Sequence, residues 1–214
     1  MKTGILFDLD GTLLDTLVDL HAAVNYTMAR FGYPERTLEE VRAFVGNGAR
    51  RLIALSVPEG ADADMPFEVF HSYYDAHCRI LTRPYDGIPE AQAKLKEKYP
   101  IAIVSNKPDS AVKLLCADYF PGIYALGETA DCPRKPAPDM LHKAMANLGA
   151  ERCIYVGDSE VDVLTAENAN VPCLSVLWGF RDRKELEEAG SEFFCADPGE
   201  LADKLETMTR FLDR

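Results

Sequence analysis

The chain of 214 residues is 47% hydrophobic and 27% charged, with a formal net charge of −12. This length and composition are ordinary for a soluble globular protein that buries a core without cross-links. The acidic balance argues against a nucleic-acid partner, which needs clustered cations, but leaves room for a small phosphorylated ligand. No apolar run approaches the ~18 residues of a membrane span, and no signal peptide is expected. Six widely spaced cysteines without a Cys-x-x-Cys pair fit a reducing, cytoplasmic location.

The first part of the chain combines one strand with a purely helical stretch. A short apolar strand is predicted over 3–7, and it ends at Asp8. From residue 16 to about 83 the apolar spacing is helical and no strand is indicated. Within this stretch we expect helices at 16–31, 38–45, 49–55 and 65–81.

After Pro84 the pattern changes to apolar strands that alternate with helices. This alternation predicts an α/β fold, a doubly wound parallel sheet covered on both faces. We therefore interpret the all-helical stretch as a cap inserted after the first strand. Residues 1–15 and 84–214 then form the core, and residues 16–83 form the cap domain. We expect helices at 89–99, 110–119, up to 148 and up to 168. The strands between them are expected at 101–104, 123–126, 153–156 and 173–177, followed by a helix at 183–189, a strand at 192–195 and a helix from 198.

Polar residues follow several of the predicted strands. In an open α/β sheet, ligands bind beyond the carboxyl ends of the strands, so these residues should meet in one crevice. The set comprises Asp8, Asp10, Gly11 and Thr12 after the first strand, Ser105 and Asn106 after the second, Lys135 in a later loop, and Asp158 with Asp162 after the strand at 153–156.

The charges of this set point to phosphoryl transfer. Asp8 and Asp158 would repel each other and any anionic ligand unless a cation lay between them. Hard oxygen ligands from few protein groups suit Mg²⁺, which also binds phosphate oxygens. Lys135 adds a second positive charge, and Ser105 with the adjoining amides can donate to phosphoryl oxygens. Asp8 can then act as a nucleophile that forms an aspartyl-phosphate, with Asp10 as general acid and base.

Four segments resemble the motifs of the haloacid dehalogenase superfamily of phosphohydrolases: 7–13 (FDLDGTL), 104–106 (VSN), 135–138 (KPAP) and 157–162 (GDSEVD). The resemblance spans nearly the whole chain, including the helical cap. It implies that Asp8 is the nucleophile and a Mg²⁺ ligand and that Asp10 is the acid/base and also reaches the metal. It further implies that Ser105, Asn106 and Lys135 hold the phosphoryl group, with Gly11 and Thr12 beside it, and that Asp158 and Asp162 bind Mg²⁺, Asp162 directly or through another ligand.

Within this superfamily the chain is most similar to the phosphoglycolate phosphatase group of bacterial enzymes. The likeness rests on residues 13–20 (LLDTLVDL) and on 45–50 (VGNGAR) in the cap; Thr16 stands where many members of the group have Ser. It implies 2-phosphoglycolate as the substrate, with Asn47 and Arg50 facing it from the cap. Arg50 matches a carboxylate geometrically, although a surface ion pair explains it equally well.

Other functions remain open at this point. Pyrophosphatases, sugar-phosphate phosphatases and phosphomutases share much of the pattern. A signalling module of the receiver type also uses a phosphorylated Asp, Mg²⁺, a hydroxyl and a Lys, but it lacks both the second acid at Asp10 and a helical insertion of this size. A catalytically idle binding protein is the third alternative. The expected partner is a small phosphorylated metabolite, with neither nucleic acid nor membrane, and the chain is expected to be a monomer or a homodimer.

Overall fold

A computed structural model describes residues 2–212 and shows a six-stranded parallel sheet with the order β5-β4-β1-β6-β7-β8. The first strand, β1, lies between β4 and β6, which continue the sheet in opposite directions. The predicted doubly wound α/β sheet is therefore confirmed. The strands are β1 (Thr3–Phe7), β4 (Ile101–Pro108), β5 (Tyr124–Glu128), β6 (Arg152–Gly157), β7 (Cys173–Val176) and β8 (Phe193–Cys195).

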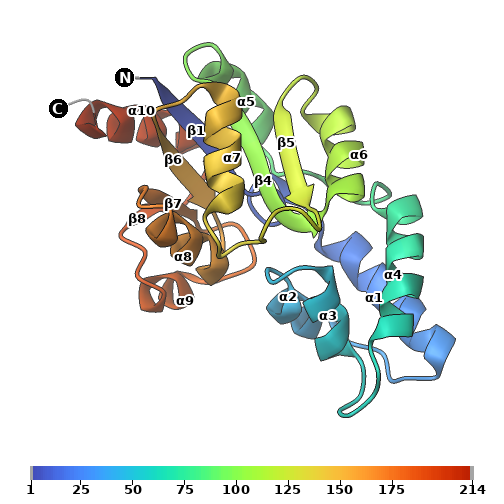
Figure 1. Ribbon diagram of the computed structural model, residues 1–214. Coiled ribbons are helices and arrows are strands. Elements are labelled where there is room, and N and C mark those ends of the chain that lie inside the picture. The colour runs from blue at the N-terminus through green and yellow to red at the C-terminus, as the bar shows by residue number, and fades with distance from the viewer. Residues whose placement is uncertain (1, 213–214) are drawn as a thin grey trace.

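Helices cover both faces of this sheet (Figure 1). Because successive strand residues point to opposite faces, Ile5 and Phe7 pack into one apolar core and Leu6 into another. The first core includes side chains of α5, α6 and α10, and the second includes side chains of α7 and α8. The helices are α5 (Ile88–Lys96), α6 (Asp109–Tyr119), α7 (Asp139–Leu148), α8 (Glu160–Asn168), α9 (Arg183–Glu188), the 3₁₀ helix η1 (Pro198–Glu200) and α10 (Leu201–Leu212).

A helical module, residues 17–77, lies beyond the carboxyl ends of the strands (Figure 1). Two short strands that the sequence did not predict pair antiparallel where the chain enters and leaves it: β2 (Leu14–Asp15) and β3 (Arg83–Pro84). Strands of two residues are too short to show a period of two. The helices of the module are α1 (Leu17–Phe31), α2 (Leu38–Phe44), α3 (Ala49–Ser56) and α4 (Asp64–His77).

Helix α4 ends at His77, four residues before the predicted end at 81. The buried Asp19 carboxylate at the start of α1 explains this difference. It accepts hydrogen bonds from the backbone N–H groups of Leu81 and Thr82 at 2.8–3.0 Å. The N–H groups of Leu81 and Thr82 therefore have hydrogen-bond partners without continuing the helix, and the bonds connect the two ends of the helical module.

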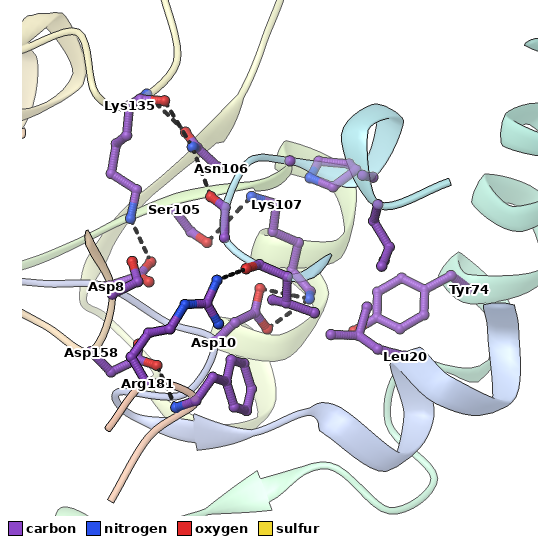
Figure 2. Close-up of a pocket in the computed structure, with 18 of the residues that line it drawn as sticks. Asp8, Asp10, Leu20, Tyr74, Ser105, Asn106, Lys107, Lys135, Asp158 and Arg181 are labelled. Atoms are coloured by element: carbon purple, nitrogen blue, oxygen red, sulfur yellow. Dashed lines mark hydrogen bonds and ion pairs between the residues drawn. The ribbon is translucent and has the colours of Figure 1, made fainter. Parts of the chain in front are cut away.

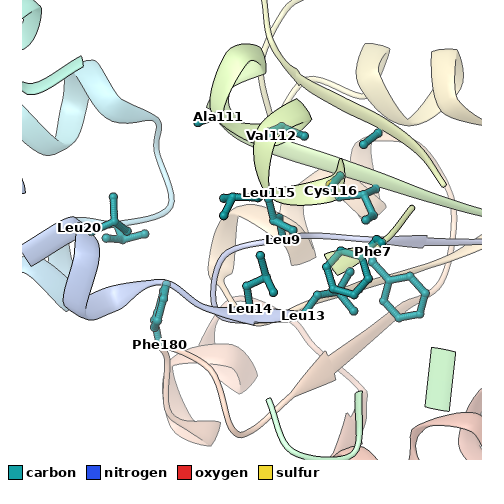
Figure 3. Close-up of a cluster of buried hydrophobic side chains, with 14 of the residues drawn as sticks. Phe7, Leu9, Leu13, Leu14, Leu20, Ala111, Val112, Leu115, Cys116 and Phe180 are labelled. Atoms are coloured by element: carbon teal, nitrogen blue, oxygen red, sulfur yellow. The ribbon is translucent and has the colours of Figure 1, made fainter. Parts of the chain in front are cut away.

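The turn after β1 is anchored by apolar side chains, which Figure 3 shows beside those of α6. Leu9, Leu13 and Leu14 are all at most 3% exposed. The carbonyl of Leu9 accepts hydrogen bonds from the N–H groups of Leu13 and Leu14, both at 3.0 Å. With Leu9 directed into the core, the flanking Asp8 and Asp10 lie at the open end of the sheet.

Among residues 2–212, no helix is long and apolar enough to cross a membrane. All six cysteines are free thiols, and all but Cys173 are buried.

Candidate active site

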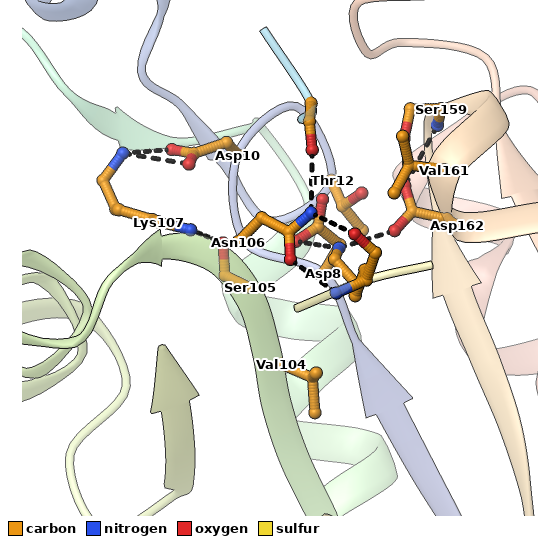
Figure 4. A network of polar contacts seen from close by, with 12 residues as sticks. Asp8, Asp10, Thr12, Val104, Ser105, Asn106, Lys107, Ser159, Val161 and Asp162 are labelled. Carbon is orange, nitrogen blue, oxygen red and sulfur yellow. Dashed lines mark hydrogen bonds and ion pairs between the residues drawn. The ribbon is translucent and has the colours of Figure 1, made fainter. Parts of the chain in front are cut away.

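Three buried carboxylates meet at the carboxyl ends of β1 and β6. Oxygen atoms of Asp8, Asp158 and Asp162 all lie within 4.8 Å of one another. The Lys135 ammonium joins them, with Nζ 2.9 Å from Asp8 Oδ1 and 2.7 Å from Asp162 Oδ1. One ammonium therefore pairs with two of the three acidic groups, and Figure 4 shows Asp8 and Asp162 where the ends of their chain segments converge.

Burial dominates the proton affinities of these groups. It raises the pKa of Asp8 to about 7, with Lys135 acting in the opposite direction. Burial and the charges of Asp162 and Asp8 raise the pKa of Asp158 well above its usual range. Burial also acts to raise the pKa of Asp162, but the adjacent Lys135 charge and the hydrogen bonds from Lys135, Ser159 and Tyr155 together outweigh it and lower that pKa. Without a further cation, the cluster is therefore unfavourable in its fully ionised form.

Asp162 holds its neighbours in place. Its Oδ1 accepts hydrogen bonds from Lys135 Nζ at 2.7 Å and Tyr155 Oη at 2.9 Å. Its Oδ2 accepts from the Ser159 hydroxyl at 2.7 Å and from the backbone N–H groups of Ser159 and Asp158 at 3.1 and 3.2 Å. Both oxygens are thus already engaged with protein donors, and the contacts orient Lys135 and the start of α8.

Asp158 is held from two sides. The Thr12 hydroxyl donates to Oδ1 at 2.9 Å, and the backbone N–H of Phe180 donates to Oδ2 at 2.8 Å. Gly11, at φ +80°, makes this approach possible, because a Cβ there would lie 2.2 Å from Asp158 Oδ2. Gly11 and Thr12 therefore contact Asp158 and do not line the pocket described below.

The Asp10 carboxylate lies apart from this cluster and pairs with Lys107, a residue that the sequence analysis did not single out. Lys107 Nζ donates to the two Asp10 oxygens at 2.7 and 2.9 Å, and its side chain is 3% exposed. Burial acts to lower the pKa of Lys107, but the contacts with Asp10 and Tyr74 together outweigh this effect and raise that pKa. The signal was available in the sequence, since Lys107 directly follows Ser105-Asn106 at the end of a predicted strand.

Ser105 and Asn106 also reach the pocket, but the Asn106 side chain is already occupied. Its Nδ2 donates to the carbonyls of Lys135 and Gly46 at 2.9 and 3.1 Å, and its Oδ1 accepts from the Lys135 N–H at 2.8 Å. Both amide hydrogens are thereby used, so Asn106 fixes the backbone that carries Lys135. Ser105 Oγ accepts from the Lys107 N–H at 3.3 Å and keeps its own hydrogen for a ligand.

These polar groups open into one pocket between the sheet and the helical module (Figure 2). In that view Asp8, Asp158 and Lys135 lie at one end, Leu20 and Tyr74 of the module lie at the other, and Asp10 with Lys107 lies between them. The module contributes mainly apolar side chains, namely Leu20, Val45, Ala49, Leu52, Phe70 and Tyr74. The pocket therefore has a polar, charged floor and an apolar wall.

Two arginines join the module to the sheet in opposite directions. Arg181 is buried; it donates to the carbonyls of Val45 and Arg42 at 2.8 and 3.1 Å and pairs with Glu160 at 2.8 Å. Arg42 donates to the carbonyls of Phe180 and Gly179, both at 2.8 Å. Phe180 also binds Asp158 through its N–H, so the contact between the two parts leads directly to the carboxylate cluster.

The two residues expected to face the substrate from the cap are not among the pocket's lining residues. Arg50 points elsewhere: its guanidinium pairs with Asp64 and Glu68 at 3.3 and 3.7 Å and lies over the Phe67 ring. The surface ion pair that the sequence also allowed for Arg50 is thus present in the structure. Asn47 is half-buried between the lining residues Gly46 and Gly48.

Comparison with known proteins shows which family the chain belongs to. The family model of haloacid dehalogenase-like hydrolases matches residues 5–176. The chain is 37% identical over 190 residues to a phosphoglycolate phosphatase of Cereibacter sphaeroides, covering 83% of this chain and 86% of that protein. It is 33% identical over 199 residues to phosphoglycolate phosphatase 1 of Pseudomonas aeruginosa, covering 86% and 72%.

Solved structures show the same fold. A crystal structure from Lactobacillus delbrueckii subsp. bulgaricus, described provisionally as a phosphoglycolate phosphatase, superposes with a TM-score of 0.88 at 35% identity, covering 96% of this chain and 99% of that one. CbbY of Rhodobacter sphaeroides, solved in complex with phosphate, gives 0.78 at 26% identity, covering 96% and 100%.

The protein belongs to the haloacid dehalogenase-like hydrolase family. Its relatives and its fold further identify it as a phosphoric monoester hydrolase similar to the phosphoglycolate phosphatases.

Proposed function

We propose that this protein is a Mg²⁺-dependent phosphatase that hydrolyses a small phosphomonoester, 2-phosphoglycolate, through an aspartyl-phosphate on Asp8. The observation that carries the proposal is the buried Asp8 carboxylate between Lys135 and Asp158 at the floor of the pocket. The name shared by several relatives supports the choice of substrate.

The residues fit a divalent cation. Asp8 Oδ1 is buried, and its closest cation in the described chain is the Lys135 ammonium, which forms an ion pair with it at 2.9 Å without satisfying it as a hydrogen-bond acceptor. Asp158 would supply a second hard oxygen ligand. Both Asp162 oxygens already accept hydrogen bonds from protein donors, so Asp162 would position the groups around the cation. A bound Mg²⁺ would offset the carboxylate charge and polarise a phosphoryl oxygen.

The first step follows from the position of Asp8. One Asp8 oxygen attacks the phosphorus, a new P–O bond forms, and the bond from phosphorus to the leaving alkoxide breaks. Lys135 and the Ser105 hydroxyl neutralise the phosphoryl oxygens as charge develops on them. Because Lys135 is fixed by Asp162 and Tyr155, little reorganisation is needed at that moment.

Asp10 handles the proton in both steps. It gives a proton to the leaving alkoxide, which departs as glycolate, and the resulting carboxylate then takes a proton from the water that attacks the aspartyl-phosphate. This second attack breaks the bond between Asp8 and phosphorus and releases inorganic phosphate. Lys107 holds the Asp10 carboxylate beside the pocket between turnovers.

The helical module serves as the cap that covers the substrate. We place the core at residues 1–15 and 84–214 and the cap at 16–83, with the β2–β3 pair as the hinge. The contacts of Arg181 and Arg42 stabilise the closed form, in which the apolar wall excludes water from the first step.

The experiment is an assay of phosphate release from 2-phosphoglycolate, pyrophosphate, sugar phosphates and a nucleoside monophosphate, with Mg²⁺ or with EDTA. We expect Mg²⁺-dependent release with a clear preference for 2-phosphoglycolate and none from Asp8→Asn. A preference for another phosphoester would refute the substrate assignment but keep the chemistry. No release from any of these esters, with a long-lived phosphoryl group on Asp8, would refute the phosphatase and favour a signalling module.

A further inference from the structure

The pocket contains a cation that the proposed phosphoryl chemistry uses only to hold Asp10. Three described pocket residues are cationic: Lys135, Arg181 and Lys107. Lys135 is committed to the carboxylate cluster, and Arg181 to backbone carbonyls and Glu160. Lys107 donates its two hydrogen bonds of normal length to Asp10 and has the Tyr74 side chain beside it, so its ammonium retains donor capacity toward the pocket.

Tyr74 provides a second, independent feature beside Lys107. Its side chain comes from α4, is 2% exposed and lines the pocket. Its hydroxyl has no hydrogen-bond partner in the described chain. Buried hydroxyls normally have partners, and an orphaned one is unfavourable, so a ligand atom is the natural partner here.

Lys107 and Tyr74 lie against each other. The Lys107 ammonium is over the Tyr74 ring, 4.7 Å from its centroid. One ligand group that enters beside Asp10 can therefore contact both the ammonium and the hydroxyl. Figure 2 shows Tyr74 at the end of the pocket away from Asp8 and Lys135, with the Lys107 ammonium between them and turned away from Asp8, so we take the group that the pair would bind to be other than the phosphoryl group.

The surroundings restrict what that group can be. Leu20, Leu52 and Phe70 form the adjoining wall and offer no polar atoms to the hydroxyls of a sugar. A compact anion satisfies the ammonium and the hydroxyl together, and a carboxylate has two oxygens for these two donors.

We propose that Lys107 and Tyr74 form a specificity subsite that binds the carboxylate of a short phosphorylated hydroxy acid, while Asp8 and Lys135 engage its phosphoryl group. This inference rests on the proposed phosphatase function and adds the residues that select the substrate. Phosphomonoesters of the same length that have a neutral group in place of the carboxylate reach the same nucleophile but leave the ammonium and the hydroxyl without a partner.

The test compares kcat/KM for 2-phosphoglycolate with that for 2-hydroxyethyl phosphate, which has a neutral group in place of the carboxylate. We expect the wild-type ratio to favour phosphoglycolate. Tyr74→Phe, which removes only the unpartnered hydroxyl, should lower the ratio about tenfold, and Lys107→Met should lower it about 10- to 100-fold, as expected for a lost bond to a charged group. The ratio separates selection from any effect on Asp10, because an altered Asp10 slows both substrates.

Matched control variants are available on the same types of element. Tyr73→Phe changes the neighbouring tyrosine of α4, which stacks on Tyr26 and His77 outside the pocket. Lys113→Met removes a lysine that lies over the Tyr124 ring, away from the pocket. Both should keep the wild-type ratio.

The outcomes are distinct. If both substrates slow equally in Tyr74→Phe and Lys107→Met, the pair only supports Asp10 and the fold, and the subsite is refuted. If the wild type does not discriminate between the substrates, the subsite is refuted while the phosphatase stands. If the wild type hydrolyses neither, the proposed function itself fails. A melting curve for each variant identifies a folding defect, and Tyr74→Phe still decides the question if Lys107→Met does not fold.

Discussion

Raising the pH without Mg²⁺ should destabilise the fold through Asp8. Burial raises the pKa of this carboxyl from 3.8 to about 7, so the folded chain holds the proton more tightly than the unfolded chain. Its contribution to stability is therefore fully present below about pH 4 and is lost as the pH rises towards about 7. A pKa difference of about 3 corresponds to roughly 4 kcal/mol over the whole window, of which roughly 2–3 kcal/mol falls between about pH 5 and about pH 8.

The neighbouring carboxyls do not reverse this sign. The pKa of Asp158 is also raised, so it acts in the same direction as Asp8. The pKa of Asp162 is lowered from 3.8, so its own contribution is lost only at lower pH, outside the range of the measurement.

The measurement is urea unfolding in EDTA at about pH 5 and about pH 8. Between these values the wild type should lose roughly 2–3 kcal/mol more unfolding free energy than Asp8→Asn, and excess Mg²⁺ should remove the loss at the higher pH. Asp131→Asn, which alters an exposed carboxyl, should behave like the wild type. Equal pH dependence in the wild type and Asp8→Asn would refute the electrostatic account of the cluster.

Two further predictions concern the groups that hold the site closed. Arg181→Met loses the hydrogen bonds to the module's carbonyls and should raise KM about tenfold or more. The control Arg183→Met, on the exposed surface of α9, should leave KM unchanged. Equal KM values for the two variants would show that the Arg181 contact plays no part in closure. Gly11→Ala places a Cβ 2.2 Å from Asp158 Oδ2 and should lower kcat at least about 100-fold. Gly122→Ala, with nearly the same φ of +78° but no atom within 4 Å of its Cβ, should retain activity; similar losses in both would assign the effect to backbone strain.

The parts of the fold that depend on long patterns were predictable from the sequence. The alternation of apolar strands and helices indicated the parallel sheet, and its carboxyl ends then implied that Asp8 and Asp158 meet. The short pair β2–β3 and the early end of α4 were not predictable, because they depend on contacts between distant residues such as Asp19 and Leu81.

The site was only partly predictable from the sequence, because it too depends on contacts between distant residues. Motif positions brought Asp8, Lys135 and Asp158 together, but their spacing did not reveal which polar atoms were already engaged. The occupied amide of Asn106 and the occupied carboxylate of Asp162 are visible only from their hydrogen bonds. Lys107 was missed although it directly follows Ser105-Asn106 at a predicted strand end, whereas Arg181 was missed because an isolated basic residue has no pattern of its own.

The central claim, an aspartyl-phosphate on Asp8, is tested most directly by trapping it. Asp10→Asn should be mixed with p-nitrophenyl phosphate and Mg²⁺, quenched in acid, and its peptides examined by mass spectrometry. This substrate has a leaving group that needs no proton, so the first step should proceed while the second, which lacks its base, is slow. The account predicts a phosphoryl group on Asp8 that disappears in an Asp8→Asn, Asp10→Asn double variant. A burst of p-nitrophenol without phosphorylation of Asp8, or with the phosphoryl group on another residue, would contradict it.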